Sequence, residues 1–237
     1  MVKTIEMDGV TFHLDTRPGK ERGKSTKNEF ILVKHQSFLE FYDEIKDQGS
    51  PKDIMEVGMF EGGSLVYFDK LFQPECLVGL DIRKDPIEPL EEYCGDRDHI
   101  KTYYGRSQDK VGTLNAARSN FPTGIDLVVD DASHLYEQTK ATFLMLFPLV
   151  RAGGTYIIED WAWSHMPNYQ GKLATWARQP AMTNLIFELI ALAGRYGVIE
   201  SIKITHELVA IKKGAGTLPE DGLGLSQVLR GKKLSKI

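Results

Sequence analysis

The chain has 237 residues, enough for one large α/β domain with a well-buried core. Hydrophobic residues make up 42% and charged residues 26%, and the net charge of −4 gives no argument for nucleic acid or an anionic membrane as a partner. No apolar run approaches the ~20 residues of a membrane span, and the start shows no signal-peptide core. Cys76 and Cys94 lack the spacing of a metal site. A cytoplasmic protein with two reduced cysteines is therefore expected.

The first part of the chain is polar. Residues 1–28 are irregular apart from a short predicted strand at Val10–Leu14. The stretch from Arg17 to Lys27 has little apolar content, which is typical either of a mobile loop or lid or of a disordered leader. Apolar residues recur at helical spacing from Glu29 to Ile45, which predicts an amphipathic helix that ends at Gly49-Ser50-Pro51.

A glycine-rich turn follows. Ile54 to Val57 predicts a strand and Ser64 to Phe72 a helix, and between them the glycines let a ligand approach the backbone closely. The pattern is neither a Walker loop nor Gly-x-Gly-x-x-Gly. Glu56 and Glu61 would repel a dinucleotide pyrophosphate and attract a cationic group, so the charge favours a sulfonium nucleoside over NAD.

The next strand also ends in an acid. Residues 76–81 predict a buried strand that closes with Asp81. A carboxylate in this place can bind a ribose diol, and the alternative is a helix cap or turn residue. After a helix over 85–93 and a strand over 100–104, the polar loop at 105–109 offers groups that can hydrogen-bond an adenine edge.

The chain is organised around residues 124–134. An apolar, β-branched run predicts a buried strand, and it ends in Asp130, Asp131, Ser133 and His134. Ligands of open α/β sheets bind outside the carboxyl ends of the strands. Helix capping needs one carboxylate, so capping alone leaves the second Asp and the His unexplained.

A second acidic pair closes the strand predicted over 155–160. Carboxylates from Asp130-Asp131 and Glu159-Asp160 are therefore expected to converge, and without compensation they would repel one another. A hard cation resolves this repulsion, and oxygen ligands suit Mg²⁺ or Ca²⁺. His134 lies about one helical turn beyond Asp131, and its unperturbed pKa near ~6.5 suits a general base, although a lone histidine is more often structural.

The rest of the chain predicts a long loop, a helix and a hairpin. The loop over 162–180 is either a functional lid or a surface insertion, and it is rich in aromatic residues beside Trp161, namely Trp163, His165 and Tyr169. An apolar helix over 182–196 precedes two alternating segments typical of a hairpin. The tail becomes basic at Arg230, Lys232, Lys233 and Lys236, and it is expected to be flexible or to pack on a partner subunit.

Strands that alternate with helices and end in a hairpin predict an α/β fold. We expect a Rossmann-like, doubly wound, mostly parallel seven-stranded sheet with one antiparallel strand. The expected organisation is an N-terminal segment over 1–28, a catalytic domain over 29–213 and a basic tail over 214–237.

These motifs carry a resemblance. With Glu-x-Gly-x-x-x-Gly-Gly-Ser from Glu56 and with Asp81, residues 28–213 resemble the class I S-adenosylmethionine-dependent methyltransferases. A narrower resemblance is to the metal-dependent macrocin and mycinamicin sugar O-methyltransferases and the related cephalosporin hydroxylase family. It rests on three motifs, which are Asp130-Asp131-x-Ser-His134, Leu146 to Gly154, and Ile158-Glu159-Asp160.

The resemblance implies a site and a reaction. It implies methyl transfer from S-adenosylmethionine to a hydroxyl of a sugar or other polyol-bearing natural product, with His134 as general base beside Asp131. It implies a divalent cation, Mg²⁺, held by Asp131, Glu159 and Asp160. It implies cofactor contacts from Glu56, Gly58, Phe60, Glu61, Ser64, Asp81, Ile82, Ser107, Gln108 and Asp130, although Asp130 alternatively supports the metal ligands.

Two other functions remain open at this point. A hydroxylase of the cephalosporin type would use the same carboxylate metal site, and transfer of a labelled methyl group separates it from a methyltransferase. A non-catalytic nucleoside-binding protein is the third class, and the dense cluster of acids with a histidine argues against it. A homo-oligomer is compatible with all three functions.

Overall fold

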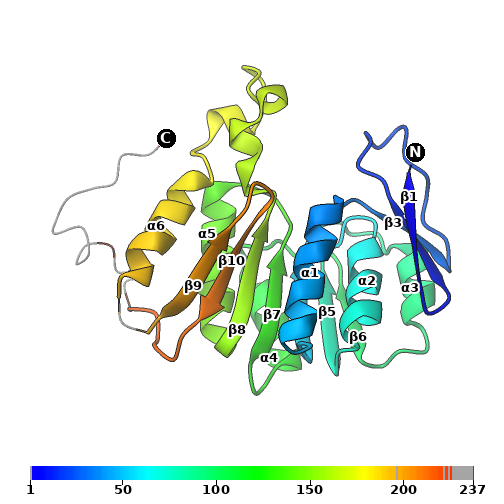
Figure 1. The fold of residues 1–237 in the computed structure, drawn as a ribbon, viewed down its shortest axis with the longest axis horizontal. Helices are drawn as coiled ribbons and strands as arrows, with labels where there is room; N and C mark the ends of the chain where they lie inside the picture. Colours follow the sequence, from blue (N-terminus) through cyan, green and yellow to red (C-terminus); the bar gives the residue numbers. More distant parts are fainter. Residues whose placement is uncertain (1, 196, 221, 224, 226–236) are drawn as a thin grey trace. The chain divides into compact units, whose positions relative to one another are not determined.

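The computed structural model describes residues 2–195, 197–220, 222, 223, 225 and 237 (Figure 1). Its internal contacts divide the chain into two compact units, Met1–Ser107 and Gln108–Ile237, and each is described by itself. The predicted basic tail residues, from 230 to 236, lie outside the described residues. No described helix is long and apolar enough to cross a membrane.

The first unit begins with a three-stranded sheet. Strand β1 (Lys3–Met7) pairs antiparallel with β2 (Val10–Leu14), which pairs parallel with β3 (Glu29–Leu32). Asp8 and Gly9 join β1 to β2 with φ of +44° and +78°, and positive φ at both central residues is typical of a two-residue hairpin turn. The strand predicted at Val10–Leu14 is confirmed, whereas β1 has no counterpart in the prediction.

The helix predicted from Glu29 to Ile45 is wrong over its first residues. They form β3, and helix α1 (Gln36–Gln48) begins only after it. Phe30, Ile31 and Leu32 are all buried, and a short continuous apolar run fits a covered strand as well as a helix. Strand β2 supplies hydrogen-bond partners for the backbone of these residues, and this pairing favours the strand over the helix.

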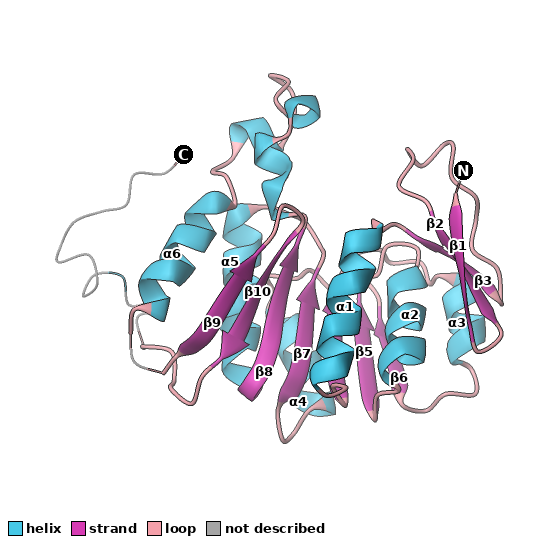
Figure 2. Ribbon diagram, viewed as in Figure 1, coloured by secondary structure: helices cyan, strands magenta, loops and turns pink. Residues whose placement is uncertain are grey.

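The remainder of the first unit alternates strands and helices. In chain order these are β4 (Asp53–Val57), α2 (Gly63–Phe72), β5 (Cys76–Leu80), α3 (Glu88–Cys94) and β6 (Ile100–Tyr103). The strands pair parallel in the order β6-β5-β4. Helices α1 and α2 lie side by side (Figure 2). They pack through Tyr42 and Phe68, whose ring centroids lie 4.8 Å apart.

Residue 63, the first residue of α2, has to be a glycine because strand β3 lies so close to it. A Cβ at this position would lie 2.1 Å from the carbonyl oxygen of Ile31 in β3. We therefore expect Gly63→Ala to force the backbones apart and to lower the free energy of unfolding by about 1–3 kcal/mol in urea titrations.

Gly95→Ala is the matched control for this substitution. Gly95 has φ −51° and ψ −34°, and its nearest Cβ contact is at 3.6 Å. We expect this variant to be neutral or up to about 1 kcal/mol more stable, because alanine restricts the unfolded chain. Equal stability of the two variants would contradict the steric argument.

The second unit contains the other four strands of the predicted sheet. Its main elements are α4 (Val111–Asn120), β7 (Ile125–Asp130), α5 (Tyr136–Leu146), β8 (Val150–Glu159), α6 (Thr183–Ala193), β9 (Ile199–Ile204) and β10 (Leu208–Lys213). The strand order is β7-β8-β10-β9, as Figure 1 shows. Strand β7 is parallel to β8, while β10 is antiparallel to both β8 and β9.

The predicted fold class is confirmed. The seven strands β4 to β10 form the mostly parallel sheet of a Rossmann-like α/β fold, and β10 is its antiparallel strand. Residues 160–182 lack long helices and contain short 3₁₀ turns, η2 (Trp161–His165), η3 (Pro167–Tyr169) and η4 (Trp176–Arg178). The boundaries proposed at residues 28 and 213 stay predictions, as does a lid role for residues 17–27.

Candidate active site

The turn between β4 and α2 has an unusual backbone. Gly58, Phe60 and Gly62 have φ of +96°, +49° and +81°, which an L side chain rarely adopts and which glycine adopts at no steric cost. The predicted cofactor residues Glu56 and Ser64 lie at the two ends of this turn and are buried. Phe60 is different, because its side chain is 47% exposed despite its apolar chemistry and its strained φ.

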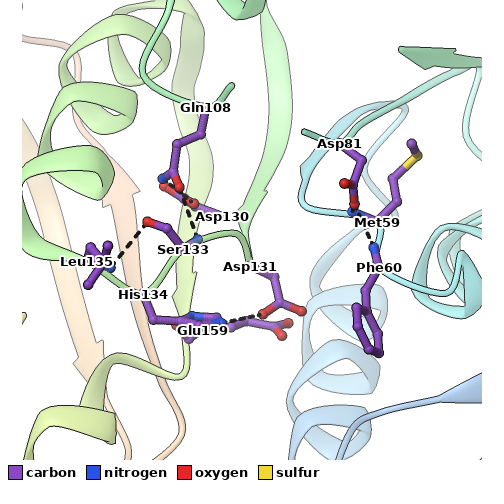
Figure 3. A network of polar contacts seen from close by, with 10 residues as sticks. All are labelled: Met59, Phe60, Asp81, Gln108, Asp130, Asp131, Ser133, His134, Leu135 and Glu159. Carbon is purple, nitrogen blue, oxygen red and sulfur yellow. Dashed lines mark hydrogen bonds and ion pairs between the residues drawn. The ribbon is translucent and has the colours of Figure 1, made fainter. Parts of the chain in front are cut away.

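Asp81 holds this turn in place. Its Oδ2 accepts the backbone N–H groups of Met59 at 3.1 Å and Phe60 at 2.9 Å (Figure 3). Its Oδ1 accepts the backbone N–H of Arg83 at 2.8 Å. The turn-residue role, which the sequence left as the alternative, is therefore one that Asp81 performs. Ribose binding stays a prediction for the lone pairs that remain. Ile82 is 72% exposed, and Ser107 is half-buried.

Substitution of Asp81 by asparagine tests this anchoring. The asparagine side chain has an NH₂ group in place of one carboxylate oxygen, and this group cannot accept a hydrogen bond from the backbone N–H groups of the turn. At least one charge-assisted hydrogen bond is therefore lost. We expect a loss of about 2–4 kcal/mol in the free energy of unfolding, measured in urea. The exposed Asp85 serves as control, and a D85N variant is expected to behave like the unaltered chain. Equal stability of D81N and D85N would show that the three contacts are not needed.

In the second unit, Asp130 at the end of β7 lies in a buried polar network. Its Oδ2 accepts the Tyr156 hydroxyl at 2.8 Å, and its Oδ1 accepts Gln108 Nε2 at 3.4 Å. Gln108 also donates to Thr142 at 3.1 Å. Its Oε1 accepts the Ser133 N–H at 3.0 Å (Figure 3). These contacts tie the loop after β6 to the start of the loop after β7.

The surroundings of Asp130 shift its protonation. Burial raises the pKa of this carboxyl to about 7, the hydrogen bond from Tyr156 opposes the rise, and the charge of Asp131 adds to it. The side chain is 2% exposed, so its described partners are protein groups. This geometry favours the supporting role for Asp130, and direct cofactor contact by Asp130 or Gln108 stays a prediction.

Three side chains of the second unit meet just beyond the ends of β7 and β8. Ligand atoms of Asp131, His134 and Asp160 all lie within 4.8 Å of one another. His134 Nε2 is 3.9 Å from Asp131 Oδ1, and its Nδ1 is 3.4 Å from the Glu159 carbonyl oxygen. Each of the three residues is half-buried.

The backbone at this cluster is strained. His134 and Asp160 have φ of +54° and +53°, conformations that cost energy for residues with a side chain. The Asp160 N–H donates to the Glu207 carbonyl at 2.7 Å, so the β9–β10 hairpin holds it there. Glu159, by contrast, is 1% exposed and approaches His134 through its main chain. Its role as a metal ligand stays a prediction.

Aromatic rings cover the histidine. The Trp163 ring centroid lies 4.3 Å from that of His134, and Tyr169 stacks on Trp163 at 5.0 Å with an interplanar angle of 2°. Trp176 packs edge-on against both rings, each at 5.0 Å. We call Trp163, Tyr169 and Trp176 the aromatic cluster.

Sequence reasoning missed several of these residues. Trp176 stands in a polar stretch, and the only signal was that a further tryptophan lies in the same loop. Tyr156 looked like one more apolar strand residue, although its position directly across from β7 places its hydroxyl on Asp130. Glu207 left no signal, because it acts through its carbonyl group and any residue type has one.

Comparisons with known proteins find similarity to methyltransferases. A family described as a methyltransferase domain matches residues 55–161. Mycinamicin VI 2''-O-methyltransferase of Micromonospora griseorubida is 31% identical over 126 residues, which cover 50% of this chain and 29% of that protein. Demethylmacrocin O-methyltransferase of Streptomyces fradiae is 30% identical over 125 residues, which cover 50% of this chain and 29% of that protein.

Solved structures give the same result. The MycE methyltransferase from the mycinamycin biosynthetic pathway, in complex with Mg and S-adenosylhomocysteine (SAH), is 25% identical with a TM-score of 0.59. The match covers 80% of this chain and 53% of that one. An O-methyltransferase from Bacillus cereus in complex with SAH, 14% identical with a TM-score of 0.54 over 76% of this chain and 82% of that one, shows the shared fold alone.

The comparisons are partial in one respect. The matched part is 29% of each curated relative, so the chain spans less than a third of their length in these matches. Within that part, the resemblance predicted from the acidic and glycine motifs is confirmed. Residues 55–161 match the family described as a methyltransferase domain, and the chain is similar to the macrocin and mycinamicin O-methyltransferases named above.

Proposed function

We propose that this chain is a metal-dependent O-methyltransferase that moves a methyl group from S-adenosylmethionine to a hydroxyl of a sugar or other polyol-bearing natural product. The observation that carries the proposal is the cluster of Asp131, His134 and Asp160. It joins two carboxylates, which suit a hard cation, to a group that can take a proton near neutral pH.

The glycine-rich turn of the first unit supports S-adenosylmethionine as the methyl donor. Its positive-φ backbone lets a ligand come close, and Glu56 and Glu61 supply negative charge for a ligand with a sulfonium and an ammonium group. Asp81 keeps lone pairs for a ribose diol while it holds the turn. The MycE structure, which was solved with SAH, is a related protein that supports the same assignment.

The residues present fit a divalent cation. Asp131 and Asp160 offer oxygen ligands from two loops, and Glu159 is the last residue of β8, directly before Asp160. Oxygen donors at this density are the environment that Mg²⁺ prefers, and the MycE structure contains Mg. Bound there, the cation would supply Lewis-acid chemistry that lowers the pKa of an acceptor hydroxyl.

His134 is the proposed general base. A proton on Nδ1, donated to the Glu159 carbonyl, leaves the Nε2 lone pair on the side of Asp131. In the proposed step Nε2 takes the proton of the acceptor hydroxyl, the oxygen forms a bond to the methyl carbon, and the carbon–sulfur bond breaks to release SAH. The negative charge of Asp131 stabilises the imidazolium that results.

The aromatic cluster supports a sugar as the acceptor. Sugar rings have apolar faces that pack on aromatic side chains. Trp163 places an aromatic ring next to His134, and Tyr169 stacks on that ring. Mycinamicin VI and demethylmacrocin, which name the two relatives, support a glycosylated small molecule in particular. The position that is methylated depends on contacts that the acceptor itself would make.

Transfer of a labelled methyl group is the direct test. The protein is incubated with methyl-labelled S-adenosylmethionine, Mg²⁺ and a panel of macrolide glycosides and simpler deoxysugar glycosides, and label in the acceptor is measured. We expect transfer that stops in excess chelator. Binding of SAH without transfer to any acceptor would favour a nucleoside-binding protein, and oxygen-dependent hydroxylation without transfer would favour the hydroxylase alternative.

A further inference from the structure

The loop between β2 and β3, residues 15–28, is held against the first unit. The Asp15 N–H donates to Leu32, and Asn28 accepts the N–H of Thr11, so both ends of the loop are fixed. Ser25 Oγ accepts the Ile31 N–H at 3.1 Å, and Lys27 pairs with Glu92 at 2.8 Å. The loop is therefore anchored to β2, β3 and α3.

The basic side chains of this loop differ in whether an acidic side chain pairs with them. The Arg17 guanidinium makes two hydrogen bonds to Asp15, at 2.8 and 2.6 Å, and this pairing lowers the pKa of the Asp15 carboxyl to about 2. Lys27 is paired as well. Among the described residues, Arg22 forms no hydrogen bond or ion pair, so its five N–H donors are available to a ligand.

Arg22 lies directly at the glycine-rich turn. Its guanidinium carbon is 4.9 Å from the centroid of the Phe60 ring. Phe60 is the exposed residue of that turn, and Asp81 fixes its backbone N–H. A guanidinium over an aromatic face is attracted to the ring, and its planar fork of N–H donors matches the geometry of a carboxylate.

The proposed methyl donor has a charge pattern that fits this arrangement. Its ammonium and sulfonium groups are cations, for which Glu56 and Glu61 supply partners, but its α-carboxylate needs a cation. Arg22 is the one basic residue of the 15–28 loop for which a contact with the turn is described.

We infer that Arg22, whose guanidinium lies over the Phe60 ring, binds the α-carboxylate of S-adenosylmethionine. The inference rests on the proposed function, because it assigns a residue to one group of the proposed methyl donor. It gives the β2–β3 loop a role in cofactor selection: ligands with the amino-acid part gain a charged, bidentate contact, and nucleosides without it do not.

Calorimetric titration of the full chain with two ligands tests this assignment. SAH has the α-carboxylate, whereas 5′-deoxy-5′-methylthioadenosine retains the nucleoside and sulfur but lacks the amino-acid part. We expect Arg22→Met to weaken SAH binding on the order of 10- to 100-fold and to leave methylthioadenosine binding unchanged. Arg22→Lys keeps the charge without the fork, so an intermediate loss for SAH is expected.

Lys24→Met is the matched control, since Lys24 is an exposed cation of the same loop. It should bind both ligands like the unaltered chain, which separates a specific contact from a general charge effect. Unchanged SAH affinity in R22M, or an equal loss for both ligands, would overturn the assignment. Failure of the unaltered chain to bind SAH would instead overturn the proposed function, and the assignment with it.

Discussion

Replacement of His134 by alanine is expected to lower methyl transfer by about 10²- to 10⁴-fold, the usual contribution of a positioned general base. SAH binding, measured by calorimetry, should not change, because no cofactor contact is assigned to the imidazole. The loss reflects the chemical step, so it should appear in kcat at saturating methyl donor and acceptor. Labelled methyl transfer under single-turnover conditions measures it directly.

The same variant separates two roles for the imidazole. His134 contributes a ring nitrogen to the group of ligand atoms with Asp131 and Asp160, and a nitrogen that binds a cation cannot also take a proton. If His134 is the base, Mg²⁺ should still raise the melting temperature of H134A. Loss of the Mg²⁺ effect together with activity would instead make His134 a metal ligand.

His165→Ala is the control for this experiment. His165 lies in the same loop region, is exposed, and hydrogen-bonds Thr183. Its substitution removes an imidazole without touching the cluster, so near-normal transfer is expected. Activity of H134A close to that of H165A would contradict the role of His134 as base.

Much of this site could be predicted because strand ends are easy to find in a sequence. An apolar run that stops at a carboxylate marks the end of a buried strand, and parallel strands bring their carboxyl ends to one edge. That reasoning placed Asp131 and Asp160 together, and the structure places their ligand atoms within 4.8 Å. The sequence also predicted Asp81 as a strand-end acid, at the point where it holds the glycine-rich turn.

The rest could not be predicted because it depends on long-range contacts. Residues 29–32 form a strand because β2 lies beside them, and the sequence of the segment itself does not indicate that pairing. The strained φ of Asp160 depends on the carbonyl of Glu207, which is 47 positions away in the chain. The position of Arg22 at Phe60 has the same origin, because a polar loop has no periodicity that fixes its path.

Substitution of Asp131 by asparagine is expected to remove the effect of Mg²⁺ on both activity and thermal stability. Without one of the two clustered carboxylates, cation binding weakens, and we expect methyl transfer to fall by more than about 100-fold. The Mg²⁺-induced rise in melting temperature should disappear as well. For the unaltered chain at about 100 times the Kd of the metal, that rise corresponds to ~2.7 kcal/mol, roughly several degrees for a chain of this size.

The metal-free D131N protein provides the sharper result. Asp131 raises the pKa of the buried Asp130 through its negative charge, and it lies close to Asp160, so the empty cluster contains carboxylates that repel one another. Removal of one charge relieves that repulsion, and the melting temperature without metal should therefore be equal to or higher than that of the unaltered chain. Glu200→Gln, which removes one charge from an exposed pair with Lys212, should keep both activity and the Mg²⁺ effect. If D131N kept the Mg²⁺ effect, Asp131 would not be a ligand, and a lower metal-free melting temperature would mean that Asp131 stabilises the fold rather than the metal.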